Sequence, residues 1–130
     1  MPKIIITIQC SKKAVEHLDP NFSNLDVSLA STTVSALDYE KLEREDVLVA
    51  LGILDKVSPR AEPFAQINAV VYRTPKKEDL LKTLAWVLAK AWFKFCKDHT
   101  ITWGETVRVQ STLADGVRQP VEEVRKYFNL

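Results

Sequence analysis

Apolar residues recur along the chain with two periods, one typical of strands and one typical of helices. The run at residues 2–9 is dense in isoleucine and predicts a strand buried on both sides. The runs at 64–72 and 106–113 alternate with polar residues and predict two more strands. A helical pattern at 76–97 separates these two strands. A crossover of this length predicts that they are parallel.

The helix expected at 76–97 is unusually apolar. Thr74 followed by Pro75 is a strong signal for its start. Apolar side chains cover well over half of its circumference, whereas one core contact usually needs a stripe about 100° wide. We therefore expect this helix to touch two apolar surfaces, for example a sheet and a neighbouring subunit.

The segment after the first strand predicts a short helix and then a strand. Ser11 can cap a helix that runs to Leu18, and Asp19-Pro20 is expected to end it. Apolar and polar residues then alternate from Leu25 to Leu29, which favours a strand.

Three further segments complete the predicted organisation. Residues 38–55 place leucine, valine and isoleucine on one broad face behind a good N-cap, Asp38, and predict a helix. Residues 58–63 contain two prolines and are the expected linker. Pro120 is expected to open a C-terminal helix at 119–128.

Composition narrows the function classes. The chain has 130 residues, 46% of them hydrophobic and 27% charged, with a net charge of +1. These values are typical of one globular domain, and they weigh against a nucleic-acid partner, which usually requires a basic excess. No apolar run is long enough to span a membrane and no export signal is present, so we expect a cytoplasmic protein. Cys10 and Cys96 are far apart and are expected to be reduced, buried side chains.

Short motifs in the second half resemble the 4-oxalocrotonate tautomerase family. They are the proline-led run Pro63–Ile67, the pair Arg73-Thr74, the segments Lys82–Leu84 and Thr106–Val109, and the sequence Leu-Ala-Asp-Gly that ends at Gly116. In that family a strand begins with proline, an Arg-Ser pair ends it, a helix follows, and a Val-Arg-Val strand closes the unit. The superfamily also includes chains of two such units, which assemble as trimers and begin with proline after the initiator methionine.

The resemblance implies an α+β fold of β-α-β units, in which a mixed sheet packs on helices. It implies a pseudo-repeat of two halves, at 1–60 and 63–116, within a single domain at 1–130, followed by the C-terminal helix. An echo between the two halves is visible, since Pro2 and Pro63 each open a strand that leads to a Ser/Thr-Lys-Lys segment. The first half departs from the pattern because Asp19-Pro20 interrupts any long helix.

The resemblance also implies a site for keto–enol proton transfer on a small carboxylate. Pro2 would be the base once Met1 is removed, because exclusion of water and nearby cations disfavour its ammonium form. Arg73 and Arg108 would hold a carboxylate or a developing oxyanion, and Lys12 would be a third cation. No cofactor or metal is expected, and a homo-oligomer, a trimer in this family, is the expected assembly. Trp86, Trp92 or Trp103 could wall the pocket, but the sequence does not select among them.

A second hypothesis belongs to another class. The apolar helix suits a non-catalytic assembly or binding module, with a protein partner favoured over single-stranded nucleic acid. Aromatic and lysine residues interleave on one flank of that helix, a pattern that can stack on bases and is also common at the edge of a core: Trp86, Lys90, Phe93 and Lys97.

Overall fold

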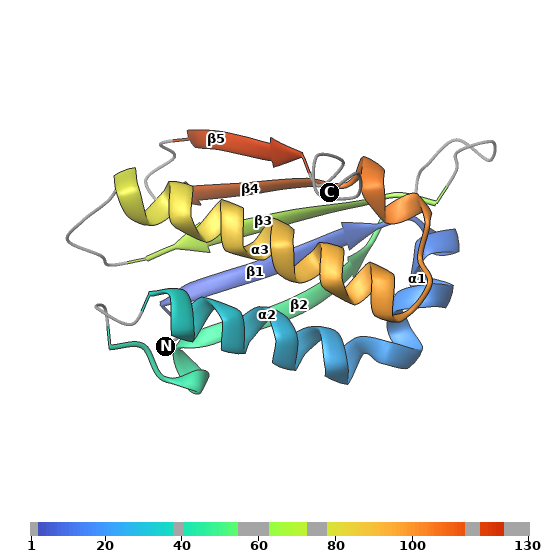
Figure 1. Ribbon diagram of the computed structural model, residues 1–130, viewed down its shortest axis with the longest axis horizontal. Helices are drawn as coiled ribbons and strands as arrows, with labels where there is room; N and C mark the ends of the chain where they lie inside the picture. Colours follow the sequence, from blue (N-terminus) through green and yellow to red (C-terminus); the bar gives the residue numbers. More distant parts are fainter. Residues whose placement is uncertain (1–2, 38–40, 55–62, 73–77, 114–117, 124–130) are drawn as a thin grey trace.

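The computed structural model describes residues 3–37, 41–54, 63–72, 78–113 and 118–123. The helices and strands follow one another in the order β1 (Ile4–Cys10), α1 (Lys12–Leu18), α2 (Phe22–Ala36), β2 (Val47–Ile53), β3 (Ala65–Val71), α3 (Glu78–Asp98), β4 (Arg108–Leu113) and β5 (Arg118–Glu123) (Figure 1). Residues 58–62 of the linker expected at 58–63 and the helix start at Thr74-Pro75 lie outside the described residues.

Two β-α-β units form one mixed sheet. β1 and β2 are parallel and are joined through α1 and α2, and β3 and β4 are parallel and are joined through α3. β1 and β3 meet antiparallel at the centre, so the strand order is β2-β1-β3-β4-β5. The expected α+β fold with a repeat of two halves is confirmed, and so is the parallel crossover in the second half.

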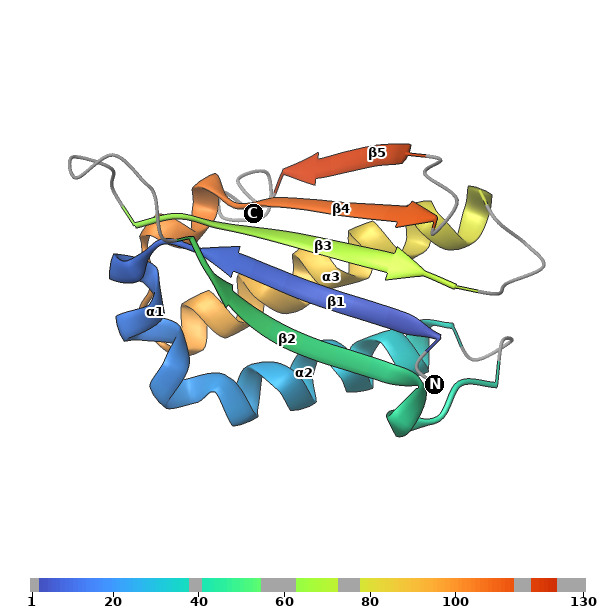
Figure 2. The same ribbon diagram turned by 180° about the vertical axis from the view of Figure 1, so that it is seen from behind.

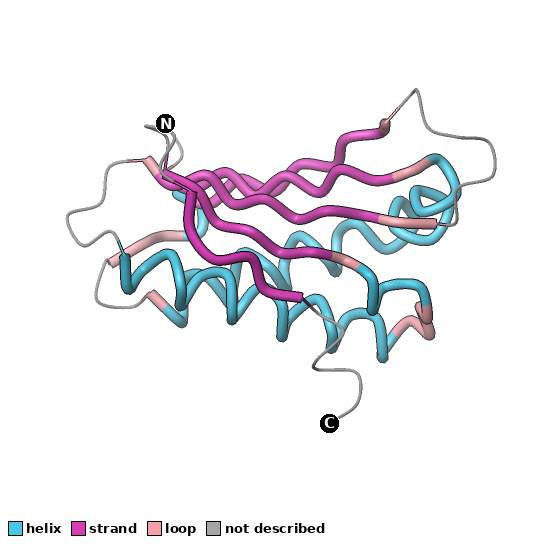
Figure 3. Tube along the Cα trace, turned by 90° about the horizontal axis from the view of Figure 1, so that it is seen from above, coloured by secondary structure: helices cyan, strands magenta, loops and turns pink. Residues whose placement is uncertain are grey.

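The helices α2 and α3 cover one face of the sheet, and no described helix covers the other (Figures 2 and 3). The core lies between these two layers. Ile4, Ile6 and Ile8 point into it and are fully buried. Burial of each such side chain stabilises the fold by about 1.5–3 kcal/mol. Ile5, on the opposite face, is only half-buried, so the prediction that β1 is buried on both sides is wrong for this chain by itself.

The strand expected at Leu25–Leu29 is wrong, because these residues belong to α2. Leu25, Leu29 and Thr33 are buried at intervals of four residues, whereas Val27 is 53% exposed. Pro20 lies in a 3₁₀ turn between α1 and α2. A proline is tolerated at the start of a helical turn, where its missing N–H has no partner to lose. The first half is therefore also a strand, a helical segment and a strand.

The helix expected at 38–55 is also wrong over the residues described there. Arg44–Asp46 form a 3₁₀ turn that is closed by a 2.8 Å hydrogen bond from Glu43 N to the Asp46 carboxylate, and Val47–Ile53 form β2. Val47 and Val49 are buried against the helices while Leu48 is exposed. Pairing with β1 gives this leucine- and valine-rich segment its hydrogen bonds, and that partner is far away in sequence.

The C-terminal helix expected at 119–128 is wrong at its start, because Arg118–Glu123 form strand β5. β5 pairs antiparallel with β4 at the edge of the sheet. Pro120 has no N–H to donate, and an edge strand tolerates this because one of its two sides needs no partner.

The long helix α3 confirms the pattern at 76–97. It packs against both α2 and the β4–β5 side of the sheet. Its wide apolar face therefore meets two surfaces, as expected, although the second surface is α2 of the same chain. None of the described helices combines the length and the apolar character that a membrane span needs.

Candidate functional site

Ser11 joins the end of β1, the start of α1 and the start of β3. Its side-chain oxygen accepts hydrogen bonds from Ala14 N at 3.3 Å and from Phe64 N at 3.2 Å. Its own N–H donates to Phe64 O at 3.1 Å. The side chain is buried, so its bond with Ala14 N is shielded from water and its bond with Phe64 N is partly shielded. Ser11 therefore caps α1 and fixes the place where Lys12 begins that helix.

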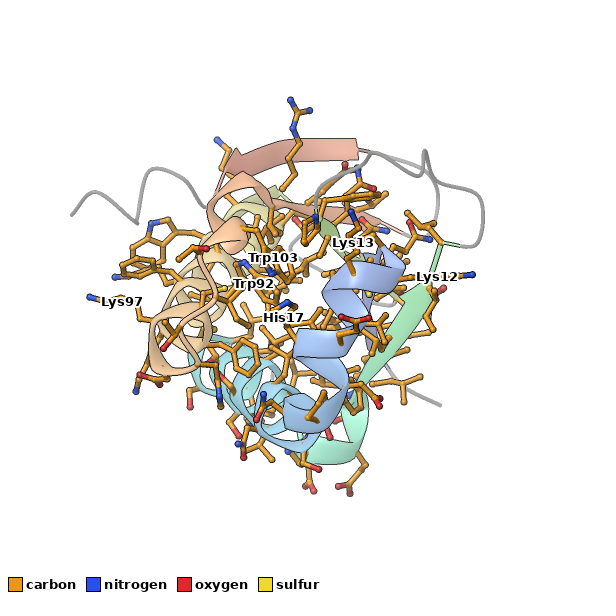
Figure 4. The ribbon with its side chains drawn as sticks, turned by 90° about the vertical axis from the view of Figure 1, so that its right-hand side faces the viewer. Lys12, Lys13, His17, Trp92, Lys97 and Trp103 are labelled. Carbon is orange, nitrogen blue, oxygen red and sulfur yellow. The ribbon has the colours of Figure 1, made fainter. Side chains whose placement is uncertain are left out.

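Lys12 and Arg108 lie at the same end of the sheet. Lys12 lies two residues after Cys10, the last residue of β1, and its exposed side chain extends away from α2 and α3 (Figure 4). Arg108 opens β4 beside Gln66, near the start of β3, and is also exposed. Because β3 is antiparallel to β1, the start of β3 and the end of β1 are neighbours.

The opposite end of the sheet holds the residues next to the other two candidates. Lys3 N donates to Asp46 O at 2.8 Å, and Tyr72 N donates to Lys3 O at 2.8 Å. Pro2 and Arg73 themselves lie outside the described residues. Their immediate chain neighbours, Lys3 and Tyr72, are thus bonded to each other.

The length of the strands separates these two ends. β1 has seven residues, and a strand rises about 3.3 Å per residue, so the ends lie about 20 Å apart. The described chain brings Lys12 and Arg108 to one end and Lys3 and Tyr72 to the other. A side chain of Arg108 cannot span this distance within one chain.

The three tryptophans have different environments. Trp92 is fully buried and donates from Nε1 to Gly104 O at 3.1 Å, so it belongs to the core. Trp103 packs against Trp92 and His17, with ring centroids 6.1 and 6.0 Å away, and lies between α1 and α3 (Figure 4). Trp86 is 46% exposed on the outer side of α3. Of the three, Trp103 is nearest to the end of the molecule that carries Lys12.

The helix-free face of the sheet carries a chain of polar side chains that the sequence analysis missed. Gln110 Nε2 donates to Thr112 Oγ1 at 3.1 Å, and Thr112 Oγ1 lies 3.2 Å from Asn68 Oδ1, to which it donates. Arg108 precedes Gln110 by two residues and so lies on the same face. The alternation of polar and apolar residues in both strands was the signal that could have identified this face.

Apolar side chains occupy the other end of the same face. Ile5 pairs in register with Leu48 on one side and with Val70 on the other. Leu48 is 48% exposed, and Ile5 and Val70 are half-buried. The face thus changes from a mainly apolar row near Lys3, in which Thr112 pairs with Val70, to a polar row near Arg108.

The two cysteines do not provide a reactive group. Burial raises the pKa of Cys10 to about 11 and that of Cys96 to about 12. Both thiols are protonated near neutral pH, and a protonated thiol is a poor nucleophile.

Comparison with known proteins identifies a fold but no family by sequence. No family model matches the chain, and no curated protein matches it. Among solved structures, it is similar to the crystal structure of Pt0534 inactivated by 2-oxo-3-pentynoate, with a TM-score of 0.58 and 15% sequence identity. The match covers 88% of this chain and 94% of that chain. The likeness therefore concerns the fold of nearly the whole chain.

Proposed function

We propose that this protein catalyses keto–enol proton transfer on a small carboxylate, with Pro2 as the base. The observation that carries the proposal is the double β-α-β fold shared with Pt0534 over 88% of the chain. In this fold β1 starts two residues after Pro2, and Lys3 is bonded to the residue before Arg73. The base and one cation therefore have chain neighbours in direct contact.

The compound that inactivates Pt0534 is one that an unprotonated amine such as Pro2 can attack. 2-Oxo-3-pentynoate carries a carboxylate, a ketone and a conjugated alkyne. An unprotonated amine can add to the alkyne carbon farther from the ketone. The electron pair then moves to the ketone oxygen, the amine loses its proton, and the carbon next to the ketone gains one. An N-terminal proline freed of Met1 is a secondary amine that can follow this course.

The proposed reaction uses the same nitrogen as a base. Pro2 N removes the hydroxyl proton of an enol and returns a proton to carbon, so the product is the ketone. Arg73 forms two hydrogen bonds with the substrate carboxylate through its planar guanidinium. A second cation at the enol oxygen stabilises the negative charge that develops on that oxygen in the transition state.

We propose that a second copy of the chain supplies this second cation. Arg108 and Lys12 lie about 20 Å from the Lys3 end of their own sheet. A homo-oligomer, a trimer if it follows the resemblance, can bring Arg108 of one copy to Pro2 of another. The exposed apolar row on the helix-free face, with Leu48 at its edge, provides surface for such an assembly.

The test is a comparison of wild type with Pro2→Ala and Arg108→Gln. Ketonisation of 2-hydroxymuconate or phenylenolpyruvate is followed by absorbance, after mass spectrometry has established that Met1 is absent. We expect Pro2→Ala to lower kcat/KM by at least 100-fold, the typical share of an acid–base group. Equal rates in wild type and Pro2→Ala would refute the proposal. Lys13→Gln removes a nearby lysine that has no proposed role, and is the matched control for Arg108→Gln.

The second candidate function is a binding module without catalysis. The specific observation that favours it is the exposed Trp86 on α3, which the proposed tautomerase site does not use.

A further inference from the structure

The outer side of α3 carries lysines and aromatic rings in one line. Lys90 Nζ lies 4.3 Å from the centre of the Trp86 ring, and Lys97 Nζ lies 5.3 Å from the centre of the Phe93 ring. We call this line the α3 stripe; its members are Lys82, Trp86, Lys90, Phe93, Lys94 and Lys97. Successive members are mostly three or four residues apart, so they share one helix face. At 1.5 Å per residue the stripe is about 22 Å long.

Charge is distributed unevenly over the molecule. Among the α3 residues whose side chains the structure describes, Asp98 is the only acidic one, and it follows the last lysine of the stripe. The other described acidic side chains lie on or next to α1, α2 and the 3₁₀ turn before β2: Glu16, Asp19, Asp26, Glu43, Glu45 and Asp46. A net charge of +1 is therefore compatible with a basic line on α3 from Lys82 to Lys97, which follows the two acidic residues that begin the helix, Glu78 and Asp79.

The α3 stripe ends, at Lys97, at the same end of the molecule as α1, but on a different side from Lys12 (Figures 1 and 4). Viewed from that end, Lys97 lies on the far flank of α3 while Lys12 extends to the opposite side (Figure 4). A ligand on the stripe does not need the proposed catalytic residues.

We propose that the α3 stripe binds single-stranded nucleic acid without base specificity. A single strand presents phosphates and flat base faces in alternation, and the stripe presents ammonium groups and aromatic rings in alternation. The exposed ring of Trp86 can stack on a base when Lys90 moves from the ring to a phosphate. Phe93 packs partly against the core, so only the outer part of its ring can contact a base. A duplex hides its base faces and can use only the lysines.

A membrane surface fits the stripe less well. Aromatic anchors in a bilayer project beyond the basic residues into the apolar layer. Here the Lys90 ammonium group lies over the face of the Trp86 ring, so the cation and the ring extend to a similar distance from the helix axis.

The experiment measures binding of a fluorescent oligo-dT of about 20 nucleotides by anisotropy, with the full chain. Four lysines that neutralise four phosphates give a salt slope of up to about −2.8 for a single strand. We therefore expect binding to weaken by up to about 50-fold between about 50 and 200 mM NaCl. Tryptophan emission should be quenched on binding, because Trp86 is the most exposed of the three tryptophans.

Four variants assign the binding to the stripe. Trp86→Ala should weaken binding at least five-fold, the lower limit for loss of one stacked base. Trp86→Phe should retain most of the binding and lose most of the quenching. Lys90→Gln with Lys97→Gln should reduce the salt slope by about 1.4. Lys13→Gln with Lys41→Gln removes the same charge elsewhere and should leave the slope and the affinity within two-fold of wild type.

Three results would overturn the proposal. They are no saturable binding of oligo-dT at 50 mM NaCl, equal binding by wild type and Trp86→Ala, or an equal loss in the Lys13/Lys41 control variant. Binding to vesicles of phosphatidylserine and phosphatidylcholine in the absence of any binding to oligo-dT would assign the stripe to a membrane surface instead. All variants change exposed or half-exposed side chains, and far-UV circular dichroism should show that each is folded.

Discussion

Removal of the Ser11 hydroxyl tests how the ends of β1, α1 and β3 are held together. In Ser11→Ala the helix α1 loses its cap, which costs about 0.5–2 kcal/mol. The Phe64 N–H also loses its acceptor in a region where Ser11 is only 4% exposed. A buried donor left without a partner costs about 1–3 kcal/mol. We expect a total loss of about 2–4 kcal/mol, a large part of the usual 5–15 kcal/mol.

The assay is urea unfolding at 25 °C, followed by tryptophan fluorescence and by circular dichroism. Ser31→Ala is the matched control, because Ser31 is exposed within α2 and alanine favours a helix. It should change the free energy of unfolding by no more than about 0.5 kcal/mol. Ser11→Thr keeps the oxygen and should recover most of the loss. If Ser11→Ala is as stable as the Ser31→Ala control, the assignment of the two hydrogen bonds is wrong.

Three further predictions concern packing, the thiols and assembly. In Gly104→Ala the new methyl group would overlap Cys96 Sγ, so we expect the free energy of unfolding in urea to fall by about 1–3 kcal/mol. Adding Cys96→Ala to the same chain should recover part of this stability, which a double-mutant cycle will measure. Burial raises the pKa of Cys10 to about 11 and that of Cys96 to about 12, so the folded state keeps thiol protons that the unfolded state releases above a pH of about 9. The free energy of unfolding should therefore fall as pH rises from about 9 to 11, and it should fall less steeply in Cys96→Ala than in wild type. If copies of the chain meet at the helix-free face, as we propose, Leu48→Lys should give a folded monomer by light scattering. Val27→Lys, which is similarly exposed on α2, should keep the proposed assembly.

The second half of the fold was predictable because local pattern and long-range packing agree there. The residues of β3 and β4 alternate, and those of α3 keep a helical period over 21 residues. The paired signals at 64–72 and 106–113 therefore led to the correct parallel pair.

The first half was not predictable in the same way, because its local patterns fit two structures. Leu25 and Leu29 are two strand repeats apart and also one helical turn apart, and the packing of α2 on α3 and β2 selects the helix. The apolar segment of β2 can likewise form a helix face, and its pairing with β1 decides otherwise. Pro120 is a start signal for a helix and is equally acceptable on the edge strand that it occupies.

The sequence could name candidate residues for the site but not their arrangement. The sequence could name Lys12 and Arg108 as cations. Only the strand directions place both at the end of the sheet opposite Lys3 and Tyr72. That separation is what makes a second copy of the chain necessary to the proposed chemistry.

The most direct test of the proposed function is mass spectrometry of the protein after incubation with 2-oxo-3-pentynoate. We predict that Met1 is absent, that each chain gains the mass of one inhibitor on the peptide that begins with Pro2, and that Pro2→Ala under the same conditions gains none. An unlabelled N-terminal peptide, or equal labelling of wild type and Pro2→Ala at lysines elsewhere, would contradict it.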